Sequence, residues 1–158
     1  MTWARGREAV QRLIDDGEID RVEPSTDIAT RLLSDAEAHV ALAALGVHTD
    51  SAGALQLSYD AARKAAAALL AVQGLRATTR GGHIAVIEAT REQFNDRSGV
   101  AVFGQINRLR RRRNDTEYPD VGTPGVTTAE AEQALAVAHD AIGAAHTLLG
   151  TGRLEPFA

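Results

Sequence analysis

Hydrophobic residues recur every three or four positions along most of this chain, the spacing that places them on one face of an α-helix. Alternation of the strand type is nearly absent, alanine is abundant, and the four prolines lie outside the periodic segments. Since alanine favours helix and proline interrupts it, the pattern predicts an all-α fold. We expect about five to six helices in an antiparallel, up-and-down bundle.

Capping residues, glycines and prolines bound the expected helices. The first three predicted helices cover about Thr2–Asp15, a segment from a cap within Ser25–Asp27 to Gly46, and a segment from Asp50 or Ser51 to Gly74. The fourth follows the 76–82 loop and carries Ile84, Ile87 and Phe94 on one face. The fifth runs from about Val100 to Pro119, and the sixth from Thr127 or Thr128 to Leu149. The segments between them are expected to be connections. No internal repeat or low-complexity linker divides the chain, which predicts one domain over 1–158, with a core of about 27–149 and a loose tail of 150–158.

Composition narrows the possible functions. The sequence has no cysteine, which excludes disulfides and thiolate metal sites. No run approaches the ~18 apolar residues of a membrane span, and the first residues lack the apolar run of a signal peptide. We therefore expect a cytoplasmic protein with no membrane partner and no cofactor. Alanine buries little area and aromatic residues are only 4% of the chain, so we expect a homodimer to add buried surface to a thin core.

Charge is unevenly distributed along the chain. The formal net charge is −4, which argues against a basic coat for nucleic acid. Lys64 is the only lysine, and the densest positive run is Arg108–Arg113, with one leucine inside it. The planar guanidinium group suits phosphate and carboxylate. An acidic protein with one arginine-dense segment suggests a local site for an anion.

The predicted fifth helix carries this segment on a face that changes character. Its apolar stripe, which includes Ile106 and Leu109, continues at helical spacing to Arg113. A parallel row continues through Arg110 to Asn114. Buried arginine and asparagine need partners. The face therefore either receives an anion, such as RNA or nucleotide phosphate, or is a solvated arginine face paired with neighbouring carboxylates.

Three segments resemble a known family. Arg111–Pro119 (Arg-Arg-Arg-Asn-Asp-Thr-Glu-Tyr-Pro) resembles the motif helix of HEPN domains, the higher-eukaryote and prokaryote nucleotide-binding proteins common in bacterial toxin–antitoxin and defence systems. Leu57–Ala65 resembles the tyrosine-containing central helix of that family, and Gly82–Ile87 resembles the start of its next helix. The resemblance spans roughly 34–149.

The resemblance implies an all-helical dimer that cleaves RNA without a metal ion at the dimer interface. Active members carry an arginine followed, after a short interval, by a histidine. A base takes the proton of a ribose 2′-hydroxyl, which attacks the adjacent phosphate, and the arginine stabilises the extra negative charge. This sequence departs from the pattern, because Thr116 stands where the histidine is expected if Arg111 is the catalytic arginine. A second register, with Arg113, Asn114 and Tyr118, has no histidine either.

These observations select the candidate site residues. The catalytic candidates are Arg111, Arg113 and Tyr118. The candidates for RNA or phosphate binding are Arg108, Arg110, Arg112 and Asn114. Further candidates are Asp115, Glu117 and His83, and His83 is the choice if a distant histidine replaces the missing one. Tyr59 is expected in the core, with its hydroxyl paired to a helix terminus.

Two functions remain open. In the first, an HEPN-like protein binds RNA or nucleotide phosphate and is a toxin-like or defence-associated endoribonuclease of reduced activity, since threonine is no general base near neutral pH. In the second, the same scaffold is a non-catalytic interaction module. By resemblance, its partner would be a nucleotidyltransferase-type antitoxin, which in some pairs attaches AMP to the motif tyrosine, Tyr118 here.

Overall fold

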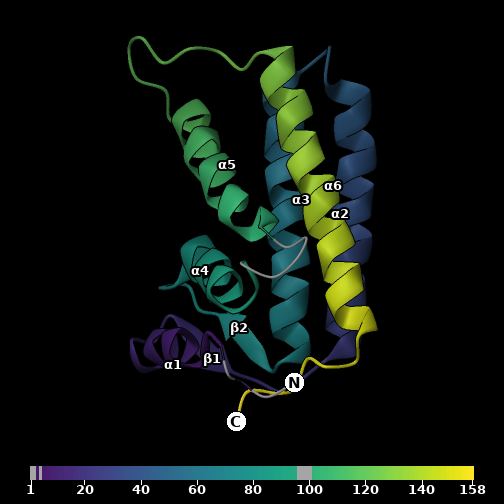
Figure 1. Ribbon diagram of the computed structural model, residues 1–158. Coiled ribbons are helices and arrows are strands. Elements are labelled where there is room, and N and C mark those ends of the chain that lie inside the picture. Colours follow the sequence, from purple (N-terminus) through teal and green to yellow (C-terminus); the bar gives the residue numbers. More distant parts are fainter. Residues whose placement is uncertain (1–2, 4, 96–100) are drawn as a thin grey trace.

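The structure is a computed structural model that describes residue 3 and residues 5–95 and 101–158. Its elements, in chain order, are α1 (Arg7–Asp15), β1 (Ile19–Arg21), α2 (Thr26–Gly46), α3 (Ser51–Val72), β2 (Leu75–Ala77), α4 (Gly82–Phe94), α5 (Val102–Glu117) and α6 (Thr128–Gly150). Figure 1 shows α2, α3 and α6 side by side as three long helices, with α5 inclined against α3 and α6, and with α1, α4 and the strands at one end. The mostly helical chain confirms the prediction of an all-α protein.

Side-chain caps begin the three long helices at the predicted places. Ser25 Oγ accepts a hydrogen bond from the backbone N–H three residues later at 3.1 Å, and Asp50 Oδ1 does the same at 2.9 Å. At the start of α6, Thr127 and Glu130 form a capping box, in which each side chain accepts from the backbone N–H of the other. These caps satisfy backbone donors that a helix N-terminus leaves unpaired.

A two-stranded antiparallel sheet occupies segments that the sequence pattern assigned to connections. β1 pairs with β2 in the register Ile19↔Ala77. Ile19 and Leu75 are 1% and 2% exposed, so the hairpin contributes to the core. The prediction of plain connections over 17–25 and 76–82 was therefore wrong. Each strand has only three residues, too few for an alternating pattern to stand out.

The first helix is shorter than predicted. It begins at Arg7 rather than near Thr2, because Gly6 adopts a left-handed conformation with φ of 75° that a regular helix does not continue through. Thr2 and Val100, the expected first residues of two helices, lie outside the described residues. In the described part of the chain, α5 begins at Val102.

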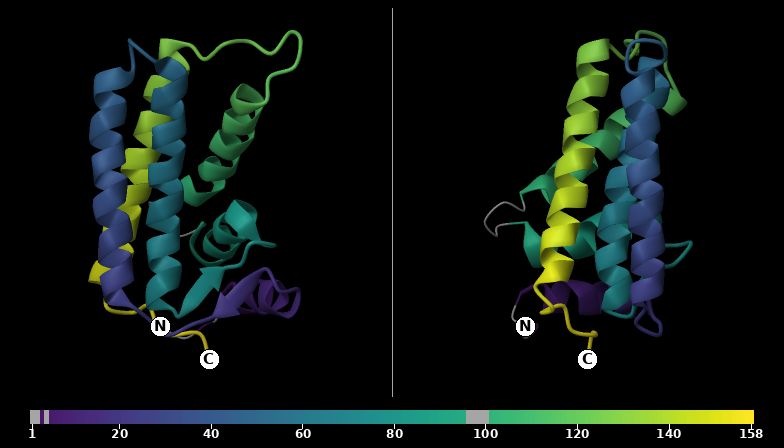
Figure 2. Two further views of the ribbon diagram at one scale, coloured as in Figure 1. Left: turned by 180° about the vertical axis from the view of Figure 1, so that it is seen from behind. Right: turned by 90° about the vertical axis from the view of Figure 1, so that its right-hand side faces the viewer.

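The C-terminal tail packs against the rest of the protein. Phe157 is 8% exposed, and its backbone N–H donates to the Gln73 carbonyl at 2.9 Å. Its ring meets Trp3 edge-on, with ring centroids 4.8 Å apart. Figure 2 shows the C-terminal end of the chain beyond the end of the long helices. The expectation of a loose tail over 150–158 is thus corrected, since one aromatic residue in a short polar segment produces no periodic signal.

Helix α3 is the central helix of the core. It contacts α2, α4, α5 and α6, and its buried side chains are mostly alanines, with Leu55, Tyr59 and Leu69 among the large ones. Small side chains let helix axes approach closely. Ile84, predicted to be buried, is 53% exposed, whereas Phe94 at the other end of α4 is fully buried. Within the described ranges, no helix is both long and apolar enough to cross a bilayer.

A buried pair of amides joins the end of α3 to α4. Gln73 Nε2 donates to Gln93 Oε1 at 2.7 Å, and Gln93 Nε2 donates back to Gln73 Oε1 at 3.1 Å. Both residues are 1% exposed. Since each buried amide satisfies the other, the pair fixes α4 against the end of α3.

Candidate functional site

The centre of the candidate site is a contact between a tyrosine and a histidine. The hydroxyl of Tyr59, on α3, lies 3.0 Å from Nδ1 of His83, in the first turn of α4. Tyr59 is fully buried, whereas His83 lies at the surface. The contact orients the imidazole ring and leaves Nε2 without a partner among the described residues. That nitrogen is therefore accessible to a ligand.

The connection before α4 holds His83 in place. The backbone N–H of Thr78 donates to the Glu18 carbonyl at 3.0 Å, and Thr78 Oγ1 accepts from the backbone N–H of Gly81 at 3.1 Å. Only glycine fits at position 81, because a Cβ atom there would lie 2.0 Å from the Glu18 carbonyl oxygen. This close approach to the residue that precedes β1 sets where α4 begins, and therefore where His83 lies.

Three arginines from two helices act electrostatically on the Tyr59–His83 pair. Arg63 follows Tyr59 by one helical turn on α3, and Arg110 and Arg113 come from α5. We call these five residues the Tyr59 cluster. Figure 1 shows how α5 leans over α3 and α4, the two elements that supply the other members.

Burial and the arginines shift the titration of both rings. Burial, the largest effect, raises the pKa of Tyr59 to about 12, against the opposing effect of Arg63. Burial also lowers the pKa of His83 below the usual 6.5, and the positive charge of Arg63 lowers it further. Near neutral pH the phenol is therefore protonated and the imidazole uncharged.

Two of the arginines retain unused hydrogen-bond donors. The Nε atoms of Arg63 and Arg113 are buried and find no acceptor in the described part of the chain. Arg63 Nη2 pairs with Asp60 Oδ1 at 3.1 Å, and Arg113 Nη1 donates to Asn114 Oδ1 at 3.3 Å. A buried donor without an acceptor costs about 1–3 kcal/mol.

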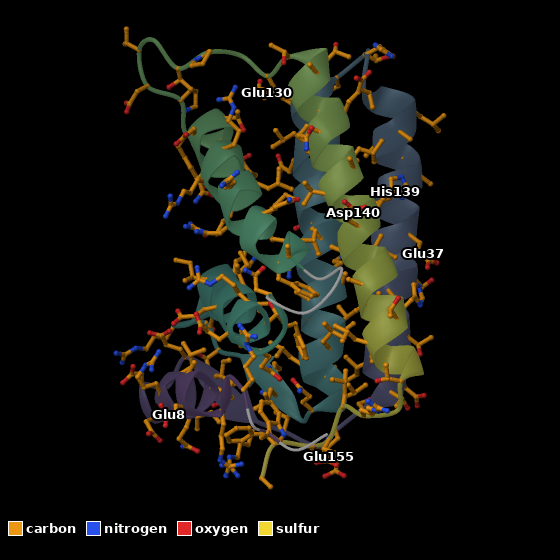
Figure 3. The ribbon with its side chains drawn as sticks, in the orientation of Figure 1. Glu8, Glu37, Glu130, His139, Asp140 and Glu155 are labelled. Atoms are coloured by element: carbon orange, nitrogen blue, oxygen red, sulfur yellow. The ribbon has the colours of Figure 1, made fainter. Side chains whose placement is uncertain are left out.

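Arg112, a predicted phosphate ligand, is used inside the fold. Its Nε and Nη2 donate to the two carboxylate oxygens of Glu130 at 2.9 and 3.2 Å, and Nη2 also donates to the carbonyls of Pro124 and Gly125 at 3.0 and 3.2 Å. Figure 3 shows Glu130 near the beginning of α6, where the connection from α5 arrives. The hydrogen bond from Arg112 holds the pKa of Glu130 below its usual range. The alternative interpretation of the arginine-dense segment, a solvated face paired with neighbouring carboxylates, expects this kind of pairing. We therefore leave Arg112 out of the Tyr59 cluster.

The other predicted residues of α5 lie outside the cluster. Five of them are exposed, namely Arg108, Arg111, Asp115, Glu117 and Tyr118. Asn114 is half-buried beside Arg113. Of the two registers considered for the motif, the one that begins at Arg111 is therefore exposed at its arginine. In the register that begins at Arg113, the charge of that arginine acts on Tyr59, while Tyr118 is 78% exposed.

Sequence reasoning did not select Arg63 or Asp60. The spacing of Tyr59 and Arg63, four residues apart on one helix, was visible and would have placed them on one face. That this face meets the arginines of α5 depends on packing between distant segments. Tyr59 is buried as expected, and its hydroxyl meets a side chain in the first turn of a helix.

Other histidines take part in separate contacts. His146 Nε2 lies 2.9 Å from Glu37 Oε1, and His39 Nε2 lies 2.7 Å from Lys64 Nζ. Among the residues that the structure describes, no three histidine, aspartate or glutamate side chains come together in a way that could hold a metal ion.

Comparison with known proteins identifies no counterpart. No protein-family model, curated protein or solved structure matches the chain. We therefore interpret the site from its own geometry, with the HEPN resemblance as a hypothesis.

Proposed function

We propose that the Tyr59 cluster binds the phosphate groups of RNA. In this proposal the chain is an HEPN-like, toxin-type or defence-associated protein that acts as a homodimer and is a metal-independent endoribonuclease of reduced activity. We infer the family from the resemblance of three segments to HEPN domains, and we infer the ligand from the chemistry of the Tyr59 cluster.

The distribution of charge carries the proposal. Three guanidinium groups act on the Tyr59–His83 pair, and Asp60 is the one carboxylate of the described residues that does so. The surplus of positive charge lies in a protein whose net charge is −4, so it is local. A cluster with a local surplus of positive charge attracts a compact polyanion such as a phosphodiester.

The protonation states suit the first step of RNA cleavage. In the tautomer that this step requires, Nδ1 of the uncharged His83 carries the proton and donates to the Tyr59 oxygen, so that Nε2 is the acceptor. Nε2 can then take the proton of a ribose 2′-hydroxyl, and the freed oxygen attacks the adjacent phosphorus and displaces the 5′-oxygen of the next nucleotide. The imidazolium then returns the proton to that leaving oxygen. Arg110 and Arg113 stabilise the negative charge that builds up on the phosphate oxygens. Tyr59, with a pKa of about 12, stays protonated and orients the histidine ring.

A comparison of charge-matched variants tests the binding site. The variant Arg110→Gln/Arg113→Gln removes two charges inside the cluster, and Arg108→Gln/Arg111→Gln removes two charges on the exposed face of the same helix. We expect the first variant to weaken binding of a single-stranded RNA by roughly tenfold or more and the second by much less, because charged hydrogen bonds at a partly buried site are stronger than exposed ones. Fluorescence anisotropy at low salt measures both. Equal losses in the two variants would refute the assignment.

A chelator-resistant cleavage assay tests the chemistry. We expect the protein to cleave unstructured RNA slowly in the presence of EDTA, and His83→Gln to abolish that cleavage while RNA binding persists. No turnover by the parent protein would remove the enzymatic part of the proposal and leave the binding site.

A non-catalytic interaction module is the second candidate function. It is favoured by the exposure of Arg111, Glu117 and Tyr118 at the end of α5, where a partner such as a nucleotidyltransferase-type antitoxin could reach them. Under this alternative, Arg111→Gln weakens binding of that partner and leaves RNA binding unchanged.

A further inference from the structure

A pocket of about 490 Å³ lies beside Arg63, on the side of the molecule formed by α2, α3, α4 and the hairpin. Its walls include Ile28 and Leu32 from α2, Ala67 and Leu70 from α3, and Val86 from α4. Figure 2 shows, in the view from behind, the first turns of α2 and the end of α3 next to the strands. A volume of this size is typical of sites for small molecules, which usually measure about 300–1,000 Å³.

The walls of the pocket are suited to an aliphatic chain. Most of the lining side chains are aliphatic, and among the described residues that line it none is aromatic. A nucleobase would find no ring to stack on here, whereas a hydrocarbon chain would find aliphatic contacts throughout. Ile28 is 54% exposed at the pocket, a large apolar side chain that a bound chain would shield from water.

One end of the pocket is cationic. Arg63 precedes Leu70 by seven residues on α3, so about 10 Å of wall separates the guanidinium end from the apolar end. Arg63 lines the pocket, and its side chain is 20% exposed. Glu23 lines the pocket at the end opposite Arg63. The backbone N–H of the preceding residue, Val22, donates to the Gly74 carbonyl, which places this segment beside the C-terminal end of α3.

Arg76 also lines the pocket but is a weaker anchor for an anion. Its side chain is 70% exposed, against 20% for Arg63, so solvent screens the charge of Arg76 more strongly. Both arginines have a carboxylate partner, since Arg76 lies 3.8 Å from Asp20 and Arg63 Nη2 lies 3.1 Å from Asp60 Oδ1. The two arginines therefore provide a matched comparison within one pocket.

From this geometry we infer that the pocket binds an unbranched aliphatic carboxylate. The carboxylate head accepts hydrogen bonds from Arg63, and the hydrocarbon chain extends past Ala67 toward Leu70 and Val86. The inference goes beyond the proposed function and does not require it, because the pocket has its own walls and its own ligand. The two sites share Arg63, so we leave that residue out of the RNA-binding test.

Calorimetric titration of the full chain tests the inference with three probes: octanoate, octanol, which lacks the charge, and propionate, which lacks most of the chain. We expect octanoate to bind at least about tenfold more tightly than either of the others, since both the charged hydrogen bond and the apolar burial contribute. Backbone NMR shifts should change along the pocket walls. Failure of octanoate to bind at millimolar concentration, equal binding of octanol, or shifts confined to other surfaces would each overturn the inference.

Variants separate the head of the site from its walls. We expect Arg63→Gln to reduce octanoate affinity about tenfold or more and to leave octanol binding unchanged, and the matched variant Arg76→Gln to have little effect on either. Ala67→Met fills the pocket and should abolish octanoate binding, whereas Ala52→Met, at an exposed position of the same helix, should not. If Arg63→Gln does not fold, the two methionine variants decide. We expect Ala67→Met to leave RNA affinity unchanged. A failure of the carboxylate-binding inference can therefore be distinguished from a failure of the proposed RNA-binding function.

Discussion

The Tyr59 hydroxyl, in the centre of the bundle, lies 3.0 Å from Nδ1 of the surface residue His83. The phenol is fully buried on α3, and the imidazole belongs to the first turn of α4. One contact thus connects a fully buried side chain of α3 to the group that we propose for proton transfer. The position and charge state of His83 consequently depend on how α4 packs on α3.

We predict that stability falls when the solution is acidified through the range in which His83 titrates. The pKa of His83 is lowered below 6.5 in the folded protein, so the unfolded chain binds the proton more readily. The destabilisation that results from protonation of His83 is absent above about pH 6.5 and increases as the pH falls from that value toward the folded pKa. Urea unfolding at about pH 7.5 and about pH 5.5 measures the effect, which His83→Gln should reduce. An NMR titration that placed the His83 pKa above 6.5 would contradict the prediction.

Glu130 should stabilise the beginning of α6 in two separable ways. Glu130→Ala loses both the capping-box interaction with Thr127 and the pair with Arg112, and we expect a loss of about 1–2 kcal/mol. Glu130→Gln keeps an oxygen for the cap and should lose about half as much. Since the pKa of Glu130 is lowered in the folded state, its stabilisation is present above 4.5 and is lost as the pH falls through the folded pKa. Denaturant unfolding of both variants at neutral and acidic pH checks this.

The buried amides of Gln73 and Gln93 should be coupled. Gln93→Met leaves the amide of Gln73 buried and unpaired, which should reduce the free energy of unfolding by about 1–3 kcal/mol. Replacing both residues with methionine removes both polar groups and should recover much of that loss. A double-mutant cycle in urea measures the coupling, and simple additivity of the two single changes would show that the amides do not act as a pair.

Docking of the C-terminal tail should be visible in the fluorescence of Trp3, the only tryptophan of the chain. Phe157→Ala removes the ring that packs against the indole and should destabilise the protein by roughly 3 kcal/mol. We expect a red shift of the Trp3 emission as the indole becomes more exposed to water. An unchanged spectrum and an unchanged unfolding midpoint would mean that the tail does not dock in solution.

Local sequence was sufficient for the long helices. Each cap was predicted to within two or three adjacent residues, because a cap interacts with a backbone group only three residues away, and the structure selects Ser25, Asp50 and Thr127. The apolar face of each helix was also a local property, repeated at helical spacing. The same reasoning missed the hairpin and the docked tail, since Ile19 and Phe157 each find their partners in remote parts of the chain.

The candidate site, too, was predictable from local sequence only in part. The arginines of α5 were recognisable from the order of residues, and so was the possibility that Arg113 continues an apolar stripe. Which arginines act electrostatically on Tyr59 and His83, and that Arg112 instead pairs with Glu130, depended on how α5 lies against α3, α4 and α6. Helical periodicity specifies the direction in which each side chain leaves its own helix. It does not specify which distant helix that side chain meets, because that is determined by the packing of the whole chain around α3.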